Sequence, residues 1–421
     1  MKNLNLKKVS ITLAGILFLI AIVLFSYNRA FKEGAAGDFH VFWLAGKTML
    51  EGGDIYYVPP GLRNFIYPPF AAFFFIPLGL MPFNIACFVF YLLNFCLIGV
   101  IFYFIKRLCV ITFGPIKNST QITTIAFLLC FKVYWNNIMM IQSNEYVFLF
   151  TLLAIFFFLK ENENWAVVCL CIAISLKIYP ILIAFWMVMR GSRWILAKFV
   201  LGGVLCISIP FLFMGVSSGF DQLNWYLHHF ILSTNKVGTF NLSYANQSLS
   251  GVFGRLFSGE VALGETSYTL IHLGPIITAQ ILMAIKIFIF LASILFIFIN
   301  KRKKIEANIF EASLLLLTIH LVSGVTWKAH LVSLFLPYMI VAAIFFKDGF
   351  EFKKISILEK LLMAILVMNS LMGQIIVGRK GQLLLNGYGE YALVMILLYV
   401  FIFKNGLSLG QTNRNTQNIL K

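Results

Sequence analysis

An acidic residue, Asp38, stands in an aromatic and apolar stretch, GDFHVFWLAGKTML, just after the first long apolar run of the chain. Two interpretations of this carboxylate are open. It is structural, either as a solvated loop acid or as the cap of the amphipathic segment 38–50, or it acts as a general base for a hydroxyl group. Segment 38–50 is suited to lie at a membrane interface, and a carboxylate in partial contact with apolar surroundings there can accept a proton. Its aromatic neighbours therefore favour the catalytic interpretation.

Lys177 is a second candidate, because this lysine lies in AISLKIYP, inside another long apolar run. Its ammonium group either snorkels to the membrane surface or binds a phosphate group there. His320 and His330 flank the outer ends of two apolar runs, and each alone is more often structural. The pair His228 and His229 has no acidic neighbour at metal-ligand spacing, so the sequence predicts no metal site.

A polar cluster, Asn246, Gln247, Ser248 and Arg255, lies in the longest stretch of the chain that is not apolar, and we expect this part to be helical. Lys286 lies deep in an apolar run, where pairing inside a helix bundle and snorkelling are both open. No Walker A, GxGxxG, HExxH or GxSxG pattern is present. An enzyme with this sequence would therefore meet its substrates at the membrane.

The composition predicts that these residues are positioned by membrane-spanning helices. Of the 421 residues, 60% are hydrophobic and 12% are charged, and the mean hydropathy is +0.90. A helix needs about 20 apolar residues to cross a bilayer, and the chain offers about ten to twelve such runs. The seven cysteines fall mostly in or beside these runs and are interpreted as small hydrophobic residues. The sequence therefore predicts an all-α polytopic membrane protein.

The net charge of +17 favours a membrane topology rather than a nucleic-acid partner. Lysines and arginines gather mainly in short clusters between apolar runs, as the positive-inside rule expects. With Lys2, Lys7 and Lys8 in the cytoplasm, the first apolar run leads outside, so Asp38 is extracytoplasmic. This run, 9–25, is longer than the core of most cleavable signal peptides and is interpreted as an uncleaved helix.

Two counts of the crossings are possible after the first helix. Residues 67–81 and 83–105 cross separately, or 67–81 forms a Pro-rich interfacial helix and only 83–105 crosses. The second count keeps the cations between 106 and 117 in the cytoplasm, and we prefer it. Residues 164–190 then form a short pair of crossings that is broken near Pro180, because proline disfavours helix at the residue before it.

The preferred count gives about 12 transmembrane helices of the length that a bilayer requires, with both termini in the cytoplasm. It predicts a single transmembrane domain, 1–403, and a polar cytoplasmic tail, 404–421. In the cell membrane, the polar loops converge on the outer face; these loops are 28–66, 140–146, 177–180, 215–274 and 323–330.

Five segments of the chain resemble motifs of glycosyltransferase family 87, whose members are GT-C enzymes that use polyprenyl-phosphate sugars, typically mannose. The stretch from Asp38 to Pro82 is similar to the family's first outer loop. The other four, in chain order, are IQSNEYVFLF for Gly-Gln-x-Asn, AISLKIYP for Lys-x-x-Pro, NQSLSGVFGRLF for Asn-Gln-Ser-Leu and TWKAHLVSLFLP for Trp-x-x-His. The resemblance runs from about residue 36 to residue 340.

The resemblance implies that Asp38 is the catalytic base of an inverting transfer. Together with the polar cluster, it implies a set of substrate-binding residues: Tyr67, Gln142, Asn144, Lys177, Asn246, Gln247, Arg255 and His330. Three departures concern the identity of the sugar more than the reaction. Ile141 replaces the usual glycine, Ala329 stands where many members have a second histidine, and Phe42-Trp43 replaces a common tyrosine pair.

We therefore predict a membrane glycosyltransferase that moves a hexose, typically mannose, from a polyprenyl-phosphate donor to a lipid or glycan acceptor on the outer face. Asp38 would take the acceptor's proton, and Lys177, with His330 or Arg255, would stabilise the departing phosphate. No cofactor or metal is expected. The partners are the bilayer, the donor and the acceptor, with no nucleic acid. The alternative is a lipid or polysaccharide transporter, although no internal repeat is visible and the polar residues share one face.

Overall fold

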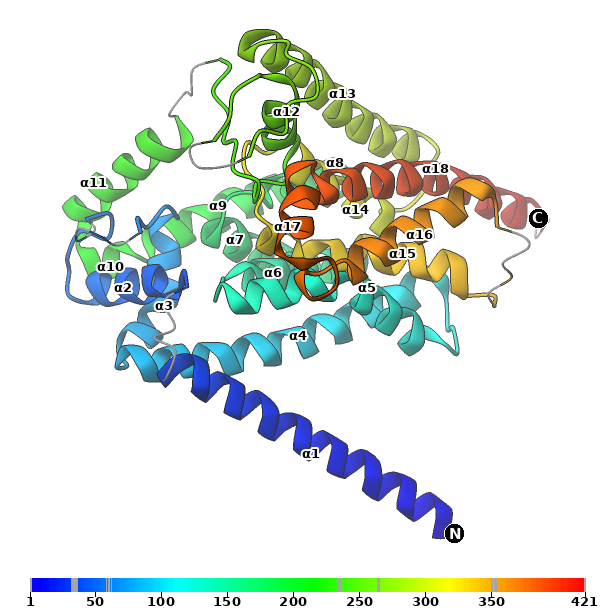
Figure 1. Cartoon of the computed structure of the whole chain (residues 1–421), viewed down its shortest axis with the longest axis horizontal. Helices are drawn as coiled ribbons and strands as arrows, with labels where there is room; N and C mark the ends of the chain where they lie inside the picture. The colour runs from blue at the N-terminus through cyan, green and yellow to red at the C-terminus, as the bar shows by residue number, and fades with distance from the viewer. Residues whose placement is uncertain are drawn as a thin grey trace.

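The computed structural model describes residues 2–31, 37–57, 59, 61, 63–232, 237–262, 266–349, 351 and 355–419. These residues form helices joined by loops and turns and contain no strand (Figure 1), so the all-α prediction is confirmed for them. Parts of the two long predicted outer loops lie outside the described residues, namely 32–36, 58, 60, 62, 233–236 and 263–265.

Among the described residues, seven helices are long and apolar enough to cross a membrane. They lie in α1 (Lys2–Phe31), α4 (Phe83–Phe113), α5 (Ser119–Met139), α9 with α10 (Ile195–Ser208 and Phe211–Met214), α13 (Pro275–Arg302), η2 with α15 (Lys328–Leu334 and Phe335–Phe346) and α18 (Glu390–Ile419). An eighth candidate is the pair α16 (Ile357–Leu371) and α17 (Gln374–Gly387), which is bent by 104°. The polytopic membrane class is therefore confirmed.

The part of the chain that the structure describes contains five further apolar helices, which are shorter: α3 (Pro69–Gly79), α6 (Asn144–Leu159), α7 (Glu163–Leu176), α8 (Ile181–Arg190) and α14 (Ile309–Val322). At 1.5 Å per residue they measure roughly 15–24 Å, which is less than the ~30 Å of hydrocarbon in a bilayer. The number of crossings thus stays a prediction. The shortness of α3 favours the count in which 67–81 lies at the interface.

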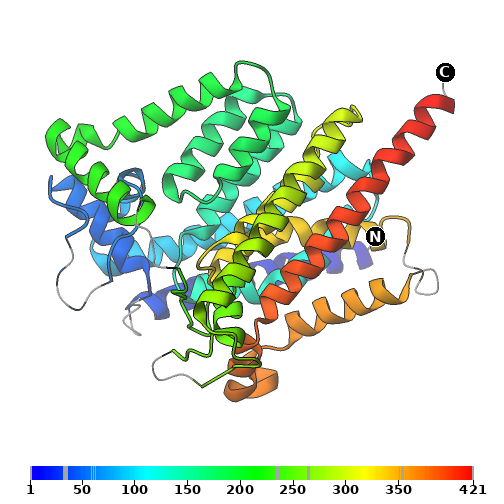
Figure 2. The ribbon, with the colours of Figure 1, turned by 90° about the horizontal axis from the view of Figure 1, so that it is seen from above.

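The bundle has two distinct ends. At one end gather α2 (Phe39–Leu50), α3 and α11 (Val216–Tyr226), while both chain termini lie toward the other end (Figures 1 and 2). The centre is formed by α14 and α15, whose side chains are buried almost throughout. In contrast, α1 leans away from the bundle and exposes most of its side chains (Figure 1). Both termini therefore share a side, and the polar loops around α2 lie opposite to them.

The predicted polar tail, 404–421, begins inside α18, which runs to Ile419. Residues 420 and 421 lie outside the described residues. The domain boundary at 403 and the cytoplasmic side of the tail stay predictions.

Close contact between α2 and α3 fixes the start of α2, where Asp38 lies. The predicted amphipathic segment 38–50 is confirmed as a separate helix, because its apolar residues Phe39, Phe42 and Met49 form one buried face. A Cβ atom on Gly46 would lie 2.6 Å from the backbone oxygen of Phe75. A glycine at this point therefore allows the two helix backbones to touch.

We expect Gly46→Ala to lower the thermal stability of the protein and to reduce any activity that depends on Asp38. The added methyl group meets backbone atoms of α3, so α2 must shift, and such overpacking costs about 1–3 kcal/mol. Gly99→Ala in α4 is the matched control, because nothing lies within 4 Å of its Cβ position. Thermal unfolding in detergent measures both, and equal melting temperatures would contradict the proposed contact.

A break between α7 and α8 brings Lys177 to the same end of the bundle as Asp38. Helix α7 ends at Leu176, and α8 begins at Ile181, directly after Pro180. Lys177 has extended backbone angles, φ −151° and ψ 129°. The predicted break near Pro180 is confirmed, and its cause is local: Pro180 has no amide hydrogen, its ring clashes with a helical carbonyl at Leu176, and it disfavours helix at Tyr179.

Candidate active site

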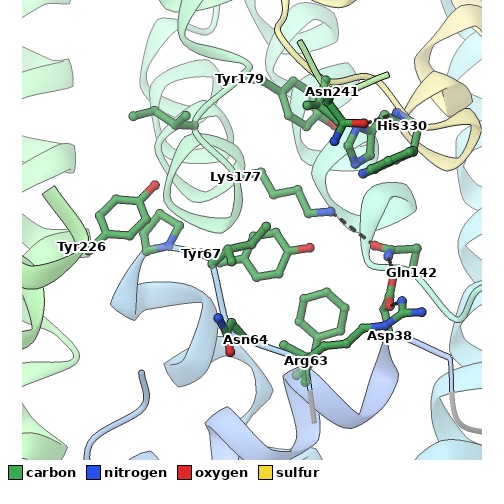
Figure 3. A pocket seen from close by; sticks show the side chains of 17 residues that line it. Asp38, Arg63, Asn64, Tyr67, Gln142, Lys177, Tyr179, Tyr226, Asn241 and His330 are labelled. Carbon is green, nitrogen blue, oxygen red and sulfur yellow. Dashed lines mark hydrogen bonds and ion pairs between the residues drawn. The ribbon is translucent and has the colours of Figure 1, made fainter. Parts of the chain in front are cut away.

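A cavity of about 560 Å³ opens at the end of the bundle where α2, α3 and α11 gather. Its walls come from distant segments: the start of α2, the chain before α3, the chain before α6, the turn between α7 and α8, and the chain around η2. Of the predicted site residues, Asp38, Tyr67, Gln142, Lys177 and His330 line it. The polar residues of the lining that the sequence did not single out are Arg63, Asn64, Tyr179, Tyr226 and Asn241 (Figure 3). Trp327, from the Trp-x-x-His segment, also lines the cavity.

Asp38 occupies the N-cap position of α2 but makes no capping hydrogen bond with its side chain. Its Oδ1 instead accepts a hydrogen bond from Arg63, and its Oδ2 accepts one from Gln142. The side chain is 21% exposed, so it remains accessible from the cavity. The capping interpretation therefore lacks its hydrogen bond, and the carboxylate faces the pocket.

The backbone around Asp38 packs tightly on the end of α5. The Asp38 amide donates to the Met140 carbonyl at 3.0 Å. The next residue, Ile141, has φ +50°, a conformation that costs a β-branched residue strain and that glycine adopts freely. This position is where the resemblance to family 87 expects glycine. The structure thus gives a physical reason for a glycine before Gln142, and Ile141 holds the same turn at a cost.

Gln142 connects the two charged residues of the pocket. Its Nε2 donates to Asp38, and its Oε1 lies 3.5 Å from the Nζ atom of Lys177. Gln142 is 7% exposed, and its backbone amide donates to the Asn137 carbonyl at 3.1 Å. Asn144 does not line the cavity, but its Oδ1 accepts from Lys177 at 2.7 Å. Gln142 and Asn144 therefore orient the charged groups.

Lys177 places a desolvated cation in the cavity wall. It is 6% exposed, and its Nζ lies 4.8 Å from the ring centre of Tyr67 (Figure 3). Both oxygens that Nζ contacts belong to neutral amides, so they leave its charge uncompensated. Burial lowers the pKa of Lys177 to about 7, while the nearby Asp38 opposes this shift. A phosphate group is the kind of ligand that would restore the charge balance.

For the phosphate-containing donor that the sequence predicts, this pKa implies that the affinity depends on pH. In the free protein the ammonium group of Lys177 loses its proton as the pH rises through about 7, so kcat/KM for the donor should fall above that value. An arginine at position 177 stays charged throughout the pH range of such an assay. The fall in kcat/KM should therefore disappear in Lys177→Arg, even if the overall activity of this variant is lower. Initial rates at low donor concentration, measured between about pH 5.5 and 9, test this prediction. The same fall in both proteins would contradict the assignment.

Two neutral hydrogen-bond donors accompany Lys177 in the wall. The Trp327 amide donates to Nδ1 of His330 at 3.4 Å, which leaves Nε2 to carry the proton of the neutral ring. The Tyr179 hydroxyl is buried and has no hydrogen-bond partner among the described residues. Both side chains line the cavity. Tyr179 could have been found from the sequence, because it belongs to the same KIYP segment as Lys177.

Asn246, Gln247 and Arg255, which were predicted to bind substrate, do not line the cavity. Asn246 donates to the Gly324 carbonyl at 3.1 Å and accepts from the Thr326 amide at 2.9 Å. The side chain of Gln247 bonds backbone atoms, as do Nε, Nη1 and Nη2 of Arg255. Asn246 thus fastens the chain that leads to Trp327 and His330, whereas the side chains of Gln247 and Arg255 join this loop to residues 386–391.

The segment 246–255 is only partly helical, in contrast to the prediction. Helix α12 spans Leu249–Phe257, and Ser248 is its N-cap, with its Oγ accepting from the Gly251 amide at 3.2 Å. Asn246 and Gln247 precede the helix, because their side chains bond the loop instead. Lys286 donates to the Ser250 Oγ at 2.5 Å and therefore ties α13 to α12.

The remaining histidines lie apart from the cavity. His320 is buried and its Nε2 lies 2.7 Å from Ser333 Oγ, which agrees with a structural role. His229 stacks on Trp225 with ring centres 4.1 Å apart. In the part of the chain that the structure describes, no three His, Cys, Asp or Glu side chains gather closely enough to hold a metal ion. The absence of a metal requirement stays a prediction.

The fold and the pocket define a helical membrane protein with a carboxylate and a buried cation in one polar cavity. The model of glycosyltransferase family 87 matches residues 65–324. Since the match covers more than half of the chain, the protein belongs to glycosyltransferase family 87, and it is a glycosyltransferase embedded in a membrane. Asp38, Arg63 and His330 lie outside the matched residues, so their roles rest on the geometry of the cavity. No curated protein matches the chain.

Proposed function

We propose that the protein transfers a hexose, with mannose as the first candidate, from a polyprenyl-phosphate donor to a lipid or glycan acceptor on the outer face of the cell membrane. The observation that carries the proposal is one cavity in which Gln142 links a carboxylate, Asp38, to a desolvated ammonium, Lys177. A proton acceptor and a phosphate-binding cation are the two groups that such a transfer requires.

The residues of the cavity suggest the following inverting step. Asp38 accepts the proton of the acceptor hydroxyl as its oxygen attacks the anomeric carbon, and the bond from that carbon to the phosphate oxygen breaks. Negative charge then grows on the departing phosphate. Lys177, Nε2 of His330 and the Tyr179 hydroxyl can bind this phosphate more strongly in the transition state than in the ground state, which speeds the reaction. Arg255 is not part of this step, because it bonds backbone carbonyls elsewhere. The step uses the charge of Lys177 and no metal.

Reconstitution in liposomes tests the proposal. Purified protein should convert a tritium-labelled polyprenyl-phosphate mannose into a new labelled product when a membrane lipid extract supplies acceptors. A transporter would move the labelled lipid between leaflets and leave it chemically intact. Donor that crosses the bilayer without any labelled product would therefore overturn the proposal in favour of transport.

The orientation in the membrane is part of the same proposal and predicts which side chains a labelling reagent can reach. We expect that Tyr57→Cys, at a residue that is 71% exposed near the cavity end, reacts with an impermeant maleimide in intact cells. Asp348→Cys, whose native side chain is 84% exposed, should react only after permeabilisation. Both are made in a background without the seven native cysteines. The reverse pattern would place the cavity in the cytoplasm.

A further inference from the structure

Both oxygens of Asp38 are engaged in the structure, although the proposed transfer needs this carboxylate to accept a proton. Arg63 donates to Oδ1 and Gln142 donates to Oδ2 (Figure 3). A carboxylate has about four lone-pair sites, so these two bonds leave others free, but a guanidinium group on Oδ1 hinders the approach of a hydroxyl to that oxygen. One of the two contacts must therefore give way before a hydroxyl can take its place on Asp38.

The burial of the two partners indicates which contact gives way. Gln142 is 7% exposed, its backbone is bonded to Asn137, and its Oε1 faces Lys177. The side chain of Arg63 is 74% exposed, and exposed ion pairs contribute little to stability. Arg63 can thus leave Asp38 at low cost, whereas moving Gln142 would also disturb Lys177.

We propose that Arg63 occupies the place of the acceptor hydroxyl on Asp38 and is displaced by the acceptor, so that the base is covered while no acceptor is present. This inference rests on the proposed function. It also assigns one side of the cavity to the acceptor and the other side to the donor phosphate. In an inverting step the nucleophile and the leaving group lie on opposite sides of the anomeric carbon, so the acceptor approaches beside Arg63 and Asn64, and the donor phosphate lies beside Lys177 and His330.

A covered base protects the donor from water. If Asp38 were free beside a bound donor, it could take a proton from a water molecule whose oxygen attacks the anomeric carbon. The bond to phosphate would break, and the products would be free sugar and polyprenyl phosphate. Arg63 on Oδ1 suppresses this hydrolysis until an acceptor hydroxyl, held by its own contacts, takes the position of the guanidinium.

The test compares Arg63→Gln with the wild-type protein in liposomes that contain tritium-labelled polyprenyl-phosphate mannose and no acceptor. We expect release of free labelled sugar to rise several-fold, up to about fivefold, because an exposed ion pair contributes up to about 1 kcal/mol. Adding a membrane lipid extract should lower this release in both proteins, because an acceptor hydroxyl then attacks in place of water. Lys47→Gln is the matched control, because it removes a cation of α2 that pairs with Glu51 and does not line the cavity.

A second measurement detects the ion pair between Arg63 and Asp38 without relying on enzymatic activity. Modification of Arg63 by phenylglyoxal, followed by mass spectrometry, should be several-fold faster in Asp38→Asn than in the wild type, since the loss of the carboxylate charge weakens the hold on the guanidinium. Equal modification rates, or a wild type that transfers sugar while Arg63→Gln shows no added hydrolysis, would overturn the inference. A wild type that neither transfers nor hydrolyses the donor, with the modification rates still different, would mean that the proposed function is wrong and that the ion pair has no such protective role.

Discussion

Asp38→Asn should leave a folded protein that transfers sugar about 10²–10⁴-fold more slowly than the wild type, which is the scale for a positioned general base. The amide side chain of asparagine has nearly the shape of the carboxylate, and its oxygen can still accept a hydrogen bond from Arg63. It cannot take the proton of an attacking hydroxyl at neutral pH. The decrease should therefore appear in kcat, while thermal stability and donor affinity change little.

Two related variants sharpen this result. Asp54→Asn is the matched control, because Asp54 belongs to the same predicted outer loop, 28–66, but does not line the cavity. Its Oδ1 accepts a hydrogen bond from the Tyr56 amide at 2.9 Å. Asp38→Glu keeps the charge but moves the oxygens by more than ~1 Å, so it should also be slow. Near wild-type turnover in Asp38→Asn would place the base elsewhere, with His330 the next residue to test. Loss of folding in that variant would make Asp38 structural.

Lys177→Met should raise the KM for the donor and lower turnover, with a combined effect of roughly 1.5–3 kcal/mol, or about ten- to hundredfold. Methionine fills nearly the same volume beside Tyr67 but offers no charge to a phosphate. The variant should fold at least as well as the wild type, because the native ammonium is buried without a compensating charge on Gln142 or Asn144. Steady-state kinetics with varied donor concentration measure both parameters.

Lys286→Met is the control for this experiment. Lys286 also interrupts an apolar helix, but it bonds Ser250 and does not line the cavity. We expect it to affect stability more than donor KM. Unchanged donor kinetics in Lys177→Met would show that Lys177 does not bind the donor, and equal kinetic losses in the two lysine variants would show that the effect is not specific to the cavity.

The class of the fold could be predicted from the sequence because its signals are local. Apolar runs of sufficient length predict membrane helices wherever they occur, and the amphipathic pattern of 38–50 predicted α2. The break at Lys177 could be predicted for the same reason, since Pro180 acts on the residues next to it. The lengths of α6, α7, α8 and α14 show where local signals become insufficient, because helices shorter than the bilayer depend on their neighbours.

The sequence by itself determined a helical membrane protein and identified several polar residues in apolar surroundings, including Asp38 and Lys177. Only the tertiary structure decided which of these residues face one cavity. It brought Arg63 onto Asp38 and Gln142 between Asp38 and Lys177, while Asn246, Gln247 and Arg255 turned to backbone carbonyls outside the cavity. The reason is that a buried polar group must find hydrogen-bond partners, and chain packing over long sequence distances determines which partners lie within reach.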